Sequence, residues 1–382
     1  MDRQDDRAPS RREALGMLGA GAAVMAAGAA NAQAPTFPKG AVIRTILKDY
    51  APEELAGGAS LFHEHMSMRQ GFMVDWTRYA AETRTANRVP NAPPPAAAGR
   101  AGPPPAPATA GPPPNPDFML DEGIVTEEMA AAKREGIGCI VDAGHPDMGR
   151  DAAFLRRVSQ KSGMPIVCSA GFYTQPFYPK ELSNWSEDQV FQAIMKQCRE
   201  NPTGALGEIG SWDYITKDER KVFRAVGRVH LATGIPIFTH TGIPGKSALE
   251  QLDILEDVGV DPRHVVIGHL GNLNDPNTEI QRAIIRRGAF IGFDRQGGAG
   301  DASVVPMAIS LINAGYADNL MFASDLSSPR DIKKWGGAGY AKTLTVFVPK
   351  VKAAGASDEV LHKIMYDNPR RFLAFVPKLK RT

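Results

Sequence analysis

The sequence predicts a (β/α)8 barrel, a fold in which eight parallel strands alternate with helices and close into a cylinder. Short apolar runs alternate with longer amphipathic stretches along most of the 382 residues, and this alternation is typical of parallel strands joined by helical crossovers. Eight apolar runs are present, the number of strands in such a barrel. An open, doubly wound sheet is the structural alternative. That fold normally carries a glycine-rich turn after its first strand, and none follows the first run here.

The apolar runs are nearly continuous, as expected of strands that are buried on both faces. The predicted strands cover residues 60–65, 137–142, 165–170, 204–208, 235–240, 265–269, 289–294 and 320–325. The predicted helices cover residues 126–135, 150–162, 187–200, 218–233, 246–258, 279–287, 304–314, 341–353 and 358–366. A further strand over residues 42–50, as one arm of a hairpin, is expected to precede the barrel.

Residues 1–34 are expected to lie outside the fold. Ser10-Arg11-Arg12 forms a twin-arginine pattern, followed by an apolar Ala/Gly-rich run and by small-residue cleavage sites. We interpret this segment as a Tat signal peptide cut after Ala32, so that the Tat export machinery delivers a periplasmic or secreted protein. The apolar run is shorter than the ~20 residues of a membrane-spanning helix, and no stable membrane anchor is predicted.

Residues 88–116 are also expected to form no regular structure. They consist almost entirely of proline, alanine and glycine, with three Pro-Pro-Pro runs. Such a composition buries little apolar area and favours polyproline II. We predict a disordered surface loop inserted in one hydrolase domain that covers residues 35–382, with a ligand for a proline-recognition domain as the alternative.

Composition and charge limit the classes of partner. Hydrophobic residues make up 43% of the chain, which is ordinary for a globular protein with a core. A net charge of +2 without a basic stripe predicts that nucleic acid is not a partner. The three cysteines are too few and too scattered for a disulfide framework. We expect His230 and His362, which fall in predicted helices, to lie at the surface.

Five of the eight predicted strands end in side chains that can bind a metal ion. These side chains are His63, His65, Glu208, His240, His269 and Asp325. Because His63 and His65 are two positions apart on a strand, they face the same side while Glu64 faces the other. The carboxyl ends of barrel strands converge on one face, where active sites lie. Four imidazoles and two carboxylates on one rim therefore predict a site for divalent metal.

Each of these residues also has a structural explanation. His240 or His269 could be a buried histidine with satisfied hydrogen bonds, Glu208 could cap a helix, and Asp325 could be an N-cap. Another histidine, His145, follows the second predicted strand and could line the barrel mouth. The shared placement of the six residues at strand ends favours the metal site over a set of separate structural roles.

The stretches around these residues resemble the phosphotriesterase family of the amidohydrolase superfamily. The matching stretches cover residues 62–65, 207–210, 239–241, 267–269, 324–325 and 367–373. The similarity extends over residues 42–375 apart from the proline-rich loop. It implies a barrel with two divalent metal ions bridged by a hydroxide. The metals are expected to be zinc, with cobalt, manganese or iron as alternatives, and the resemblance also suggests a homodimer.

The resemblance further implies which residues hold each metal. The ligands of the more buried metal are His63, His65 and Asp325. The ligands of the more exposed metal are His240 and His269. In the best-known members the bridging ligand is a carboxylated lysine, whereas this chain has no lysine at that place. A Gly-Glu-Ile-Gly stretch occurs in some relatives, and we therefore interpret Glu208 as the bridging ligand here.

The implied reaction is hydrolysis of a lactone or carboxylic ester by the metal-bridging hydroxide, with Asp325 accepting the proton. Residues 171–173 and 292–295 resemble segments of phosphotriesterase-like lactonases in which a tyrosine leans over the metals and an arginine lines the pocket. These residues are Tyr173 and Arg295, whose donors suit a carbonyl oxygen that becomes negative. Both could instead be mouth-lining residues without a role in catalysis.

Three other functions fit parts of the sequence. Phosphotriester hydrolysis, the aryldialkylphosphatase reaction, could occur at the same metal site. A barrel that binds a metal or a ligand without turnover is the alternative outside enzymes. A structural or surface protein that meets its partners through residues 88–116 is the third, and it predicts that deletion of this loop abolishes function.

Overall fold

The computed structural model describes residues 35–86, 114–242, 247–273, 275, 277–298 and 300–381. The predicted signal peptide and nearly all of the proline-rich loop lie outside the described residues, so the predictions made for these two segments, including export, stay predictions. Within the described ranges, no helix combines the length and apolar character needed to cross a bilayer.

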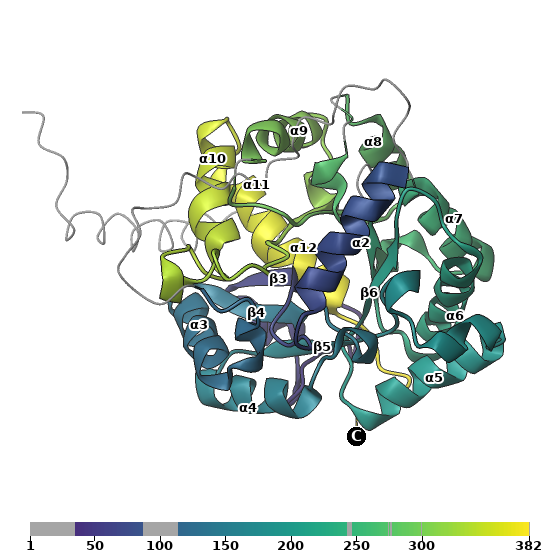
Figure 1. The fold of residues 1–382 in the computed structure, drawn as a ribbon. Coiled ribbons are helices and arrows are strands. Elements are labelled where there is room, and N and C mark those ends of the chain that lie inside the picture. Colours follow the sequence, from purple (N-terminus) through teal and green to yellow (C-terminus); the bar gives the residue numbers. More distant parts are fainter. Residues whose placement is uncertain are drawn as a thin grey trace, which may run out of the picture.

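Eight parallel strands form the barrel, which confirms the predicted fold class (Figure 1). The strands are β3 (Ala59–Glu64), β4 (Ile137–Asp142), β5 (Ile166–Ala170), β6 (Ala205–Ser211), β7 (Ile237–Thr241), β8 (Val265–Ile267), β9 (Phe290–Phe293) and β10 (Leu320–Phe322). Each strand pairs with the next one along the chain. The first and last strands meet just beyond β10, where the Asp325 N–H donates to the His63 carbonyl at 3.2 Å.

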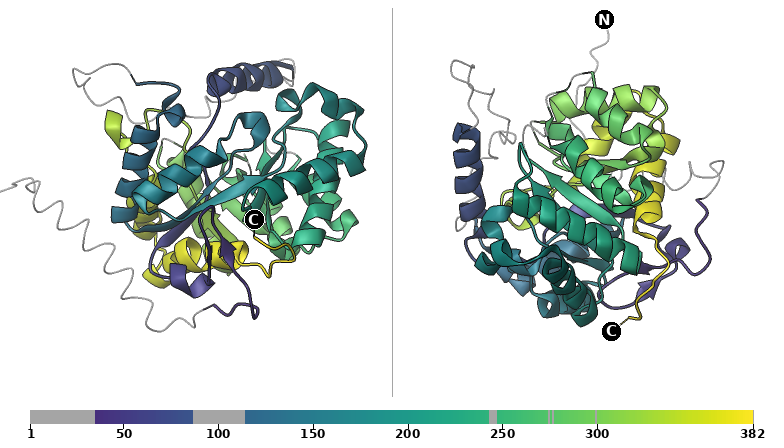
Figure 2. Two further views of the ribbon diagram at one scale, coloured as in Figure 1. Left: turned by 90° about the horizontal axis from the view of Figure 1, so that it is seen from below. Right: turned by 90° about the vertical axis from the view of Figure 1, so that its right-hand side faces the viewer.

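Helices cover the outside of the cylinder (Figures 1 and 2). They are α3 (Glu122–Arg134), α4 (Ala152–Ser162), α5 (Glu187–Glu200), α6 (Lys217–Thr233), α7 (Ala248–Val258), α8 (Glu279–Arg286), α9 (Asp301–Asn313), α10 (Val348–Ala353), α11 (Asp358–His362) and α12 (Asn368–Leu373). The two predicted C-terminal helices are interrupted by π-helical turns, Thr343–Phe347 and Lys363–Asp367. Each turn lies just before a proline, Pro349 or Pro369, which lacks the N–H of a regular helix.

The core has an inner layer that fills the barrel and an outer layer between strands and helices. Phe62, Phe238 and Met321 belong to the inner layer and are fully buried. A short hairpin, β1 (Ile43–Arg44) and β2 (Asp49–Tyr50), closes one end of the barrel together with α12 (Figure 2). Residues 42–50 therefore contain both arms of the hairpin, whereas we predicted one strand across them, because the chain turns sharply between these strands.

A helix that the sequence analysis missed, α2 (Phe72–Ala86), lies across the opposite end of the barrel (Figures 1 and 2). Phe72, Trp76 and Ala80 are buried, with exposed fractions of 2%, 7% and 3%. Their spacing of four residues places them on one helix face. That spacing is visible in the sequence and could have revealed the helix.

Candidate active site

The structure brings together all six of the candidate metal ligands that the sequence analysis singled out. The histidines and Asp325 lie at or just after the carboxyl ends of β3, β7, β8 and β10, on the side of the barrel that α2 covers. Glu208 lies within β6, which continues to Ser211 and does not end at residue 208 as predicted. The Glu208 carboxylate is at the centre. Its Oε1 lies 2.5 Å from Nδ1 of His240, 3.0 Å from Nε2 of His269 and 3.4 Å from Nε2 of His63. Its Oε2 lies 3.5 Å from Nε2 of His65.

Asp325 faces the same cluster from the end of β10. Its Oδ1 lies 3.1 Å from Nε2 of His65 and 3.7 Å from Nε2 of His63. Asp325 and His269 have backbone φ angles of 47° and 61°, in the left-handed region that non-glycine residues rarely occupy. Strained backbone of this kind persists where the surrounding structure enforces it, and it often marks functional sites.

Asp294 connects two of the histidines from outside the cluster. Its Oδ2 lies 2.8 Å from Nδ1 of His63 and its Oδ1 lies 2.9 Å from Nδ1 of His269. A carboxylate on Nδ1 fixes the orientation and tautomer of an imidazole and leaves Nε2 as a free electron-pair donor. Asp294 therefore turns Nε2 of both rings towards Glu208. The sequence analysis placed Asp294 in a strand but gave it no role.

Glu64 and Asp147 also support the site, and neither was identified from the sequence. The Glu64 carboxylate accepts hydrogen bonds from the N–H groups of Ser324 and Leu326, which flank Asp325. Asp147, in the loop after β4, accepts a hydrogen bond from the Tyr173 N–H at 2.8 Å. In both cases the side chain binds the backbone of a distant loop, a contact that leaves no local pattern in the sequence.

The electrostatics place three of the six candidate ligands in the protonation states that metal binding requires. Burial would raise the pKa of Glu208, but the imidazoles of His63 and His240 lower it well below its usual value. Burial would likewise raise the pKa of Asp325, and Arg295 lowers it well below the usual value. Burial lowers the pKa of His240 to about 4. Both carboxylates are therefore charged at neutral pH, and His240 is neutral.

His65 and His63 have raised pKa values and therefore favour the protonated, positively charged form. Burial lowers the pKa of His65, but Asp325 and Glu208 outweigh it and raise that pKa to about 9. His63 is affected in the same way by Glu208 and Asp294, and its pKa lies well above the usual value. Buried carboxylates at this density need a compensating positive charge, which protons or metal cations can supply.

The donor set fits divalent cations. Two groups, His63–His65–Asp325 and His63–Glu208–His269, each bring three ligand atoms within 4.8 Å of one another. Nε2 of His63 is buried and, among the described residues, has no hydrogen-bond partner. Imidazole nitrogens and carboxylate oxygens are the ligands that zinc and its neighbours among the first-row metals take in proteins.

Tyr173 and Arg295 lie beside the cluster and line the same cavity. The Tyr173 hydroxyl is 3.1 Å from Nδ1 of His240 and accepts a hydrogen bond from Nε1 of Trp76 at 2.8 Å. Arg295 donates from Nε to Oδ2 of Asp325 at 2.8 Å. The structure also places His145 in the interior, with its Nδ1 3.6 Å from Oδ1 of Asp147.

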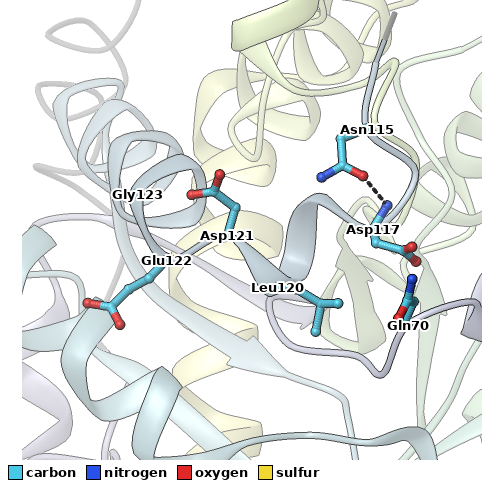
Figure 3. A pocket seen from close by; sticks show the side chains of 7 residues that line it. All are labelled: Gln70, Asn115, Asp117, Leu120, Asp121, Glu122 and Gly123. Carbon is cyan, nitrogen blue, oxygen red and sulfur yellow. Dashed lines mark hydrogen bonds between the residues drawn. The ribbon is translucent and has the colours of Figure 1, made fainter.

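A second hollow lies at the surface and gathers no comparable set of ligands. It has a volume of about 640 Å3 and is lined by Gln70, Asn115, Asp117, Leu120, Asp121, Glu122 and Gly123 (Figure 3). Asp121 caps α3 through the Ile124 N–H, and Glu122 pairs with Arg157 and Lys161. Figure 3 shows Asp121 and Glu122 pointing away from Asp117. The cluster around Glu208 is therefore the candidate active site.

Comparison with known proteins agrees with this assignment. Residues 46–373 match the model of the phosphotriesterase family. The chain belongs to the phosphotriesterase family. Enzymes of this family are binuclear metal-dependent hydrolases, and this member carries the His/Glu/Asp cluster described above. It is therefore a metal-dependent hydrolase.

Relatives of this family member carry three different names. N-acetyltaurine hydrolase from Xenopus tropicalis is 26% identical over 362 residues, which cover 87% of this chain and 98% of the relative. Phosphotriesterase homology protein from Escherichia coli is 30% identical over 269 residues, covering 68% and 91%. Aryldialkylphosphatase from Saccharolobus solfataricus is 31% identical over 271 residues, covering 65% and 84%.

A solved structure agrees with the fold of this family member. The crystal structure of phosphotriesterase homology protein from Escherichia coli, complexed with phosphate in its active site, matches with a TM-score of 0.68 and 25% identity. The match covers 85% of this chain and all of the solved chain. The names of the three relatives given above do not point to one type of substrate.

Proposed function

We propose that this member of the phosphotriesterase family is a binuclear hydrolase of carboxylic esters or lactones. The observation that carries the proposal is the position of two hydrogen-bond donors beside the cluster. The Tyr173 hydroxyl lies next to His240, and the Arg295 guanidinium lies next to Asp325. Donors in this position suit a carbonyl oxygen that becomes negatively charged as its carbon is attacked.

We assign two divalent cations, zinc first and cobalt, manganese or iron as alternatives, to the six side chains of the cluster. In this assignment His63, His65 and Asp325 would hold one cation, His240 and His269 would hold the other, and Glu208 would be a ligand shared by both. When bound, the cations supply a water of lowered pKa and polarise the electrophile. The distances from Glu208 to all four imidazoles support its role as the shared ligand.

Asp325 is the residue we assign to proton transfer. Its side chain is 9% exposed, whereas the other five ligand side chains are at most 3% exposed. A carboxylate with a lowered pKa at the edge of the cluster can accept a proton at its Oδ1 or Oδ2 and pass it to the leaving oxygen. Its ion pair with Arg295 keeps the carboxylate charged before the reaction.

Tyr173 and Arg295 keep their protons at neutral pH and can therefore act as donors. Burial raises the pKa of Tyr173 well above its usual value. Burial lowers the pKa of Arg295, but the neighbouring Asp325 outweighs it, and the guanidinium stays charged. Both groups lie on loops that follow barrel strands, and they can approach one carbonyl oxygen from two directions.

Amide hydrolysis is the second candidate, since the alignment with N-acetyltaurine hydrolase spans 98% of that relative. N-acetyltaurine carries a sulfonate, which needs a cationic group to bind it. Among the described residues that line the cavity, Arg295 and His65 are the only side chains that can carry a positive charge, and both are paired with Asp325. This pairing favours an uncharged substrate. Phosphotriesters are also uncharged, so only rates can separate them from esters.

The test measures metal content and four initial rates on the same preparation. The full chain is loaded with zinc, cobalt or manganese, and its bound metal is counted by mass spectrometry. Rates are then compared for an aliphatic lactone, an aryl ester, N-acetyltaurine and an aryl phosphotriester. We expect about two metals per chain and fastest turnover of the lactone or the aryl ester.

Matched variants identify the site. His65→Asn should lose metal and activity, while His362→Asn, a change of the same type outside the cluster, should keep both. Fastest turnover of the phosphotriester or N-acetyltaurine would overturn the ester assignment and keep the metal site. A chain that binds no metal after loading would overturn the mechanism itself.

A further inference from the structure

The cavity above the cluster is too small for any ester. Its volume is about 20 Å3, close to the ~10–15 Å3 that one water molecule needs. Pockets that bind small molecules have volumes of about 300–1,000 Å3. A substrate can therefore reach Glu208 and Asp325 only if some part of the cavity wall moves.

The wall that separates the cluster from solvent is α2. Phe72, Met73 and Trp76 line the cavity from the inner face of this helix, and α2 lies across the barrel end, outside the ring of helices that surrounds the strands (Figures 1 and 2). Its outer face is exposed, with Val74 at 67%. The helix thus packs on the barrel through one stripe of residues, and its displacement would leave the strands intact.

Trp76 lies against the two groups that we assign to the substrate carbonyl. Its Nε1 donates to the Tyr173 hydroxyl at 2.8 Å, and the Arg295 guanidinium lies 5.8 Å from the centre of its ring. Its ring also packs against the ring of Trp212, with 5.8 Å between the two ring centres. Both donors assigned to the substrate carbonyl are therefore in contact with one aromatic side chain of α2.

The start of α2 provides a fixed end. The Arg69 N–H donates to the Met148 carbonyl at 3.0 Å, and the Gly71 N–H donates to Oδ1 of Asp117 at 2.9 Å. Gly71 has a φ of 70°, which glycine adopts without strain. These bonds hold the chain just before the helix, so that the helix can swing about this point.

We propose that α2 is a substrate-binding lid and that Trp76 determines specificity for uncharged esters with an apolar acyl or aryl group. Opening removes Trp76 from Tyr173 and Arg295 and exposes the cluster. Reclosure packs the apolar inner face of α2, together with Met68 and Met148, which also line the cavity, against the apolar part of the substrate. The specificity part rests on the proposed function, whereas the opening of α2 can be tested without catalysis.

The first experiment measures opening by thiol labelling of the full chain. Ala80→Cys places a thiol on the buried face of α2, and Ala132→Cys places one on α3, where the alanine is 1% exposed. Val74→Cys on the exposed face of α2 gives the rate of unhindered labelling. Cys139, Cys168 and Cys198 are buried, and the unmodified chain gives their background. If α2 opens locally, Ala80→Cys should react at least about tenfold faster than Ala132→Cys. Equal rates for these two variants would overturn the lid.

The second experiment measures specificity as the ratio of kcat/KM for an octanoyl ester to kcat/KM for an acetyl ester. Trp76→Ala should raise this ratio about tenfold or more, because a bulky apolar group gains space under the lid. Trp76→Phe should leave the ratio within about twofold, since it keeps an aromatic ring on the inner face of α2 and removes the N–H that binds Tyr173.

The control is Trp185→Phe, which alters a partly buried tryptophan outside the cavity and should change neither the ratio nor kcat. If Trp76→Ala lowers both rates equally and leaves the ratio unchanged, Trp76 is only structural and the specificity proposal is wrong. If the unmodified, metal-loaded chain hydrolyses no ester, the proposed function fails, and the labelling result for α2 still stands by itself.

Discussion

Glu64 holds the backbone on both sides of Asp325. Its Oε1 accepts the Ser324 N–H at 2.7 Å, and its Oε2 accepts the Leu326 N–H at 2.9 Å. The two hydrogen bonds therefore fix the turn in which Asp325 has its left-handed backbone conformation. Glu64 comes from the first barrel strand and this turn follows the last, so one side chain both closes the barrel and positions a proposed metal ligand.

Replacing Glu64 by glutamine should weaken metal binding as well as the fold. Glutamine keeps one acceptor oxygen and presents an NH2 group to the second N–H, which leaves a buried donor unpaired at a cost of about 1–3 kcal/mol. The displaced turn should reduce metal affinity about 10–100-fold. Chemical unfolding and competition with a chromogenic zinc chelator measure the two effects.

The matched control for this change is Glu128→Gln. Glu128 is a buried carboxylate on α3 that accepts the Lys334 N–H at 3.0 Å. The Glu128→Gln variant should lose stability but keep its metal affinity. Unchanged metal affinity in Glu64→Gln would contradict the positioning role.

Asp294→Asn should weaken metal binding. Asparagine can accept from only one of the two imidazoles that Asp294 binds, so His63 or His269 loses its orientation and its fixed tautomer. We expect metal affinity to fall about 10–100-fold. Metal titration monitored by mass spectrometry gives the affinity.

Asp301→Asn serves as the comparison for Asp294→Asn, because Asp301 is a buried carboxylate of α9 that pairs with Lys350 outside the cluster. Asp294→Asn should bind metal more weakly than Asp301→Asn. The positioning role of Asp294 is wrong if they retain metal equally well.

Removal of the metals should lower the melting temperature. The cluster then keeps its buried carboxylates without the cations that compensate them, and binding to the native state no longer contributes to stability. A free metal concentration of 100 times the Kd contributes about 2.7 kcal/mol. Calorimetry of the chelator-treated chain with added zinc should show a melting temperature that rises with zinc in the unmodified chain and not in His65→Asn. A melting temperature independent of zinc would argue against a resident metal.

Acid should destabilise the metal-free protein partly through His230. We expected this residue at the surface, but its side chain is buried, and its Nδ1–H donates to the Ile235 carbonyl at 2.7 Å. Burial lowers the pKa of His230 to about 4. Between pH 6.5 and 4 the unfolded chain therefore binds a proton that the folded chain does not, and stability is lost as the pH falls.

The loss that His230 causes over this range should be roughly 2–3 kcal/mol. His230→Asn should be less stable at pH 7 and should lose less on acidification, because it removes the group that titrates. Urea unfolding of both metal-free chains at several pH values gives the comparison. Parallel pH dependence of the two chains would show that His230 does not titrate in this way.

Much of the barrel could be predicted because its signals are local. The predicted boundaries of α5 match the structure, since Ser186 and Gln189 form a capping box that is visible in the sequence. The start of α6 was predicted within one residue, next to the Thr216–Glu219 box. The six residues at strand ends could be found because a parallel barrel brings all strand ends to one rim.

The rest of the site depends on contacts between distant residues. Asp294 is 231 positions from His63, and Glu64 is 262 positions from Leu326, so no sequence window contains either pair. Trp76 lies within a helix pattern, but its contact with Tyr173 depends on how α2 crosses the barrel. These relationships follow from packing, and a single sequence does not encode them as motifs.

The contact between the first barrel strand, β3, and the turn after the last strand, β10, has a consequence for folding kinetics. A chain that has been synthesised only as far as β9 contains His63 and His65 but lacks Asp325 and the turn that Glu64 binds. Contacts of such long sequence separation form late, because a large loop must close before they contribute free energy. Hydrolytic activity should therefore appear only when the cylinder is complete, so that activity reports the final step of folding and partly folded chains remain inactive.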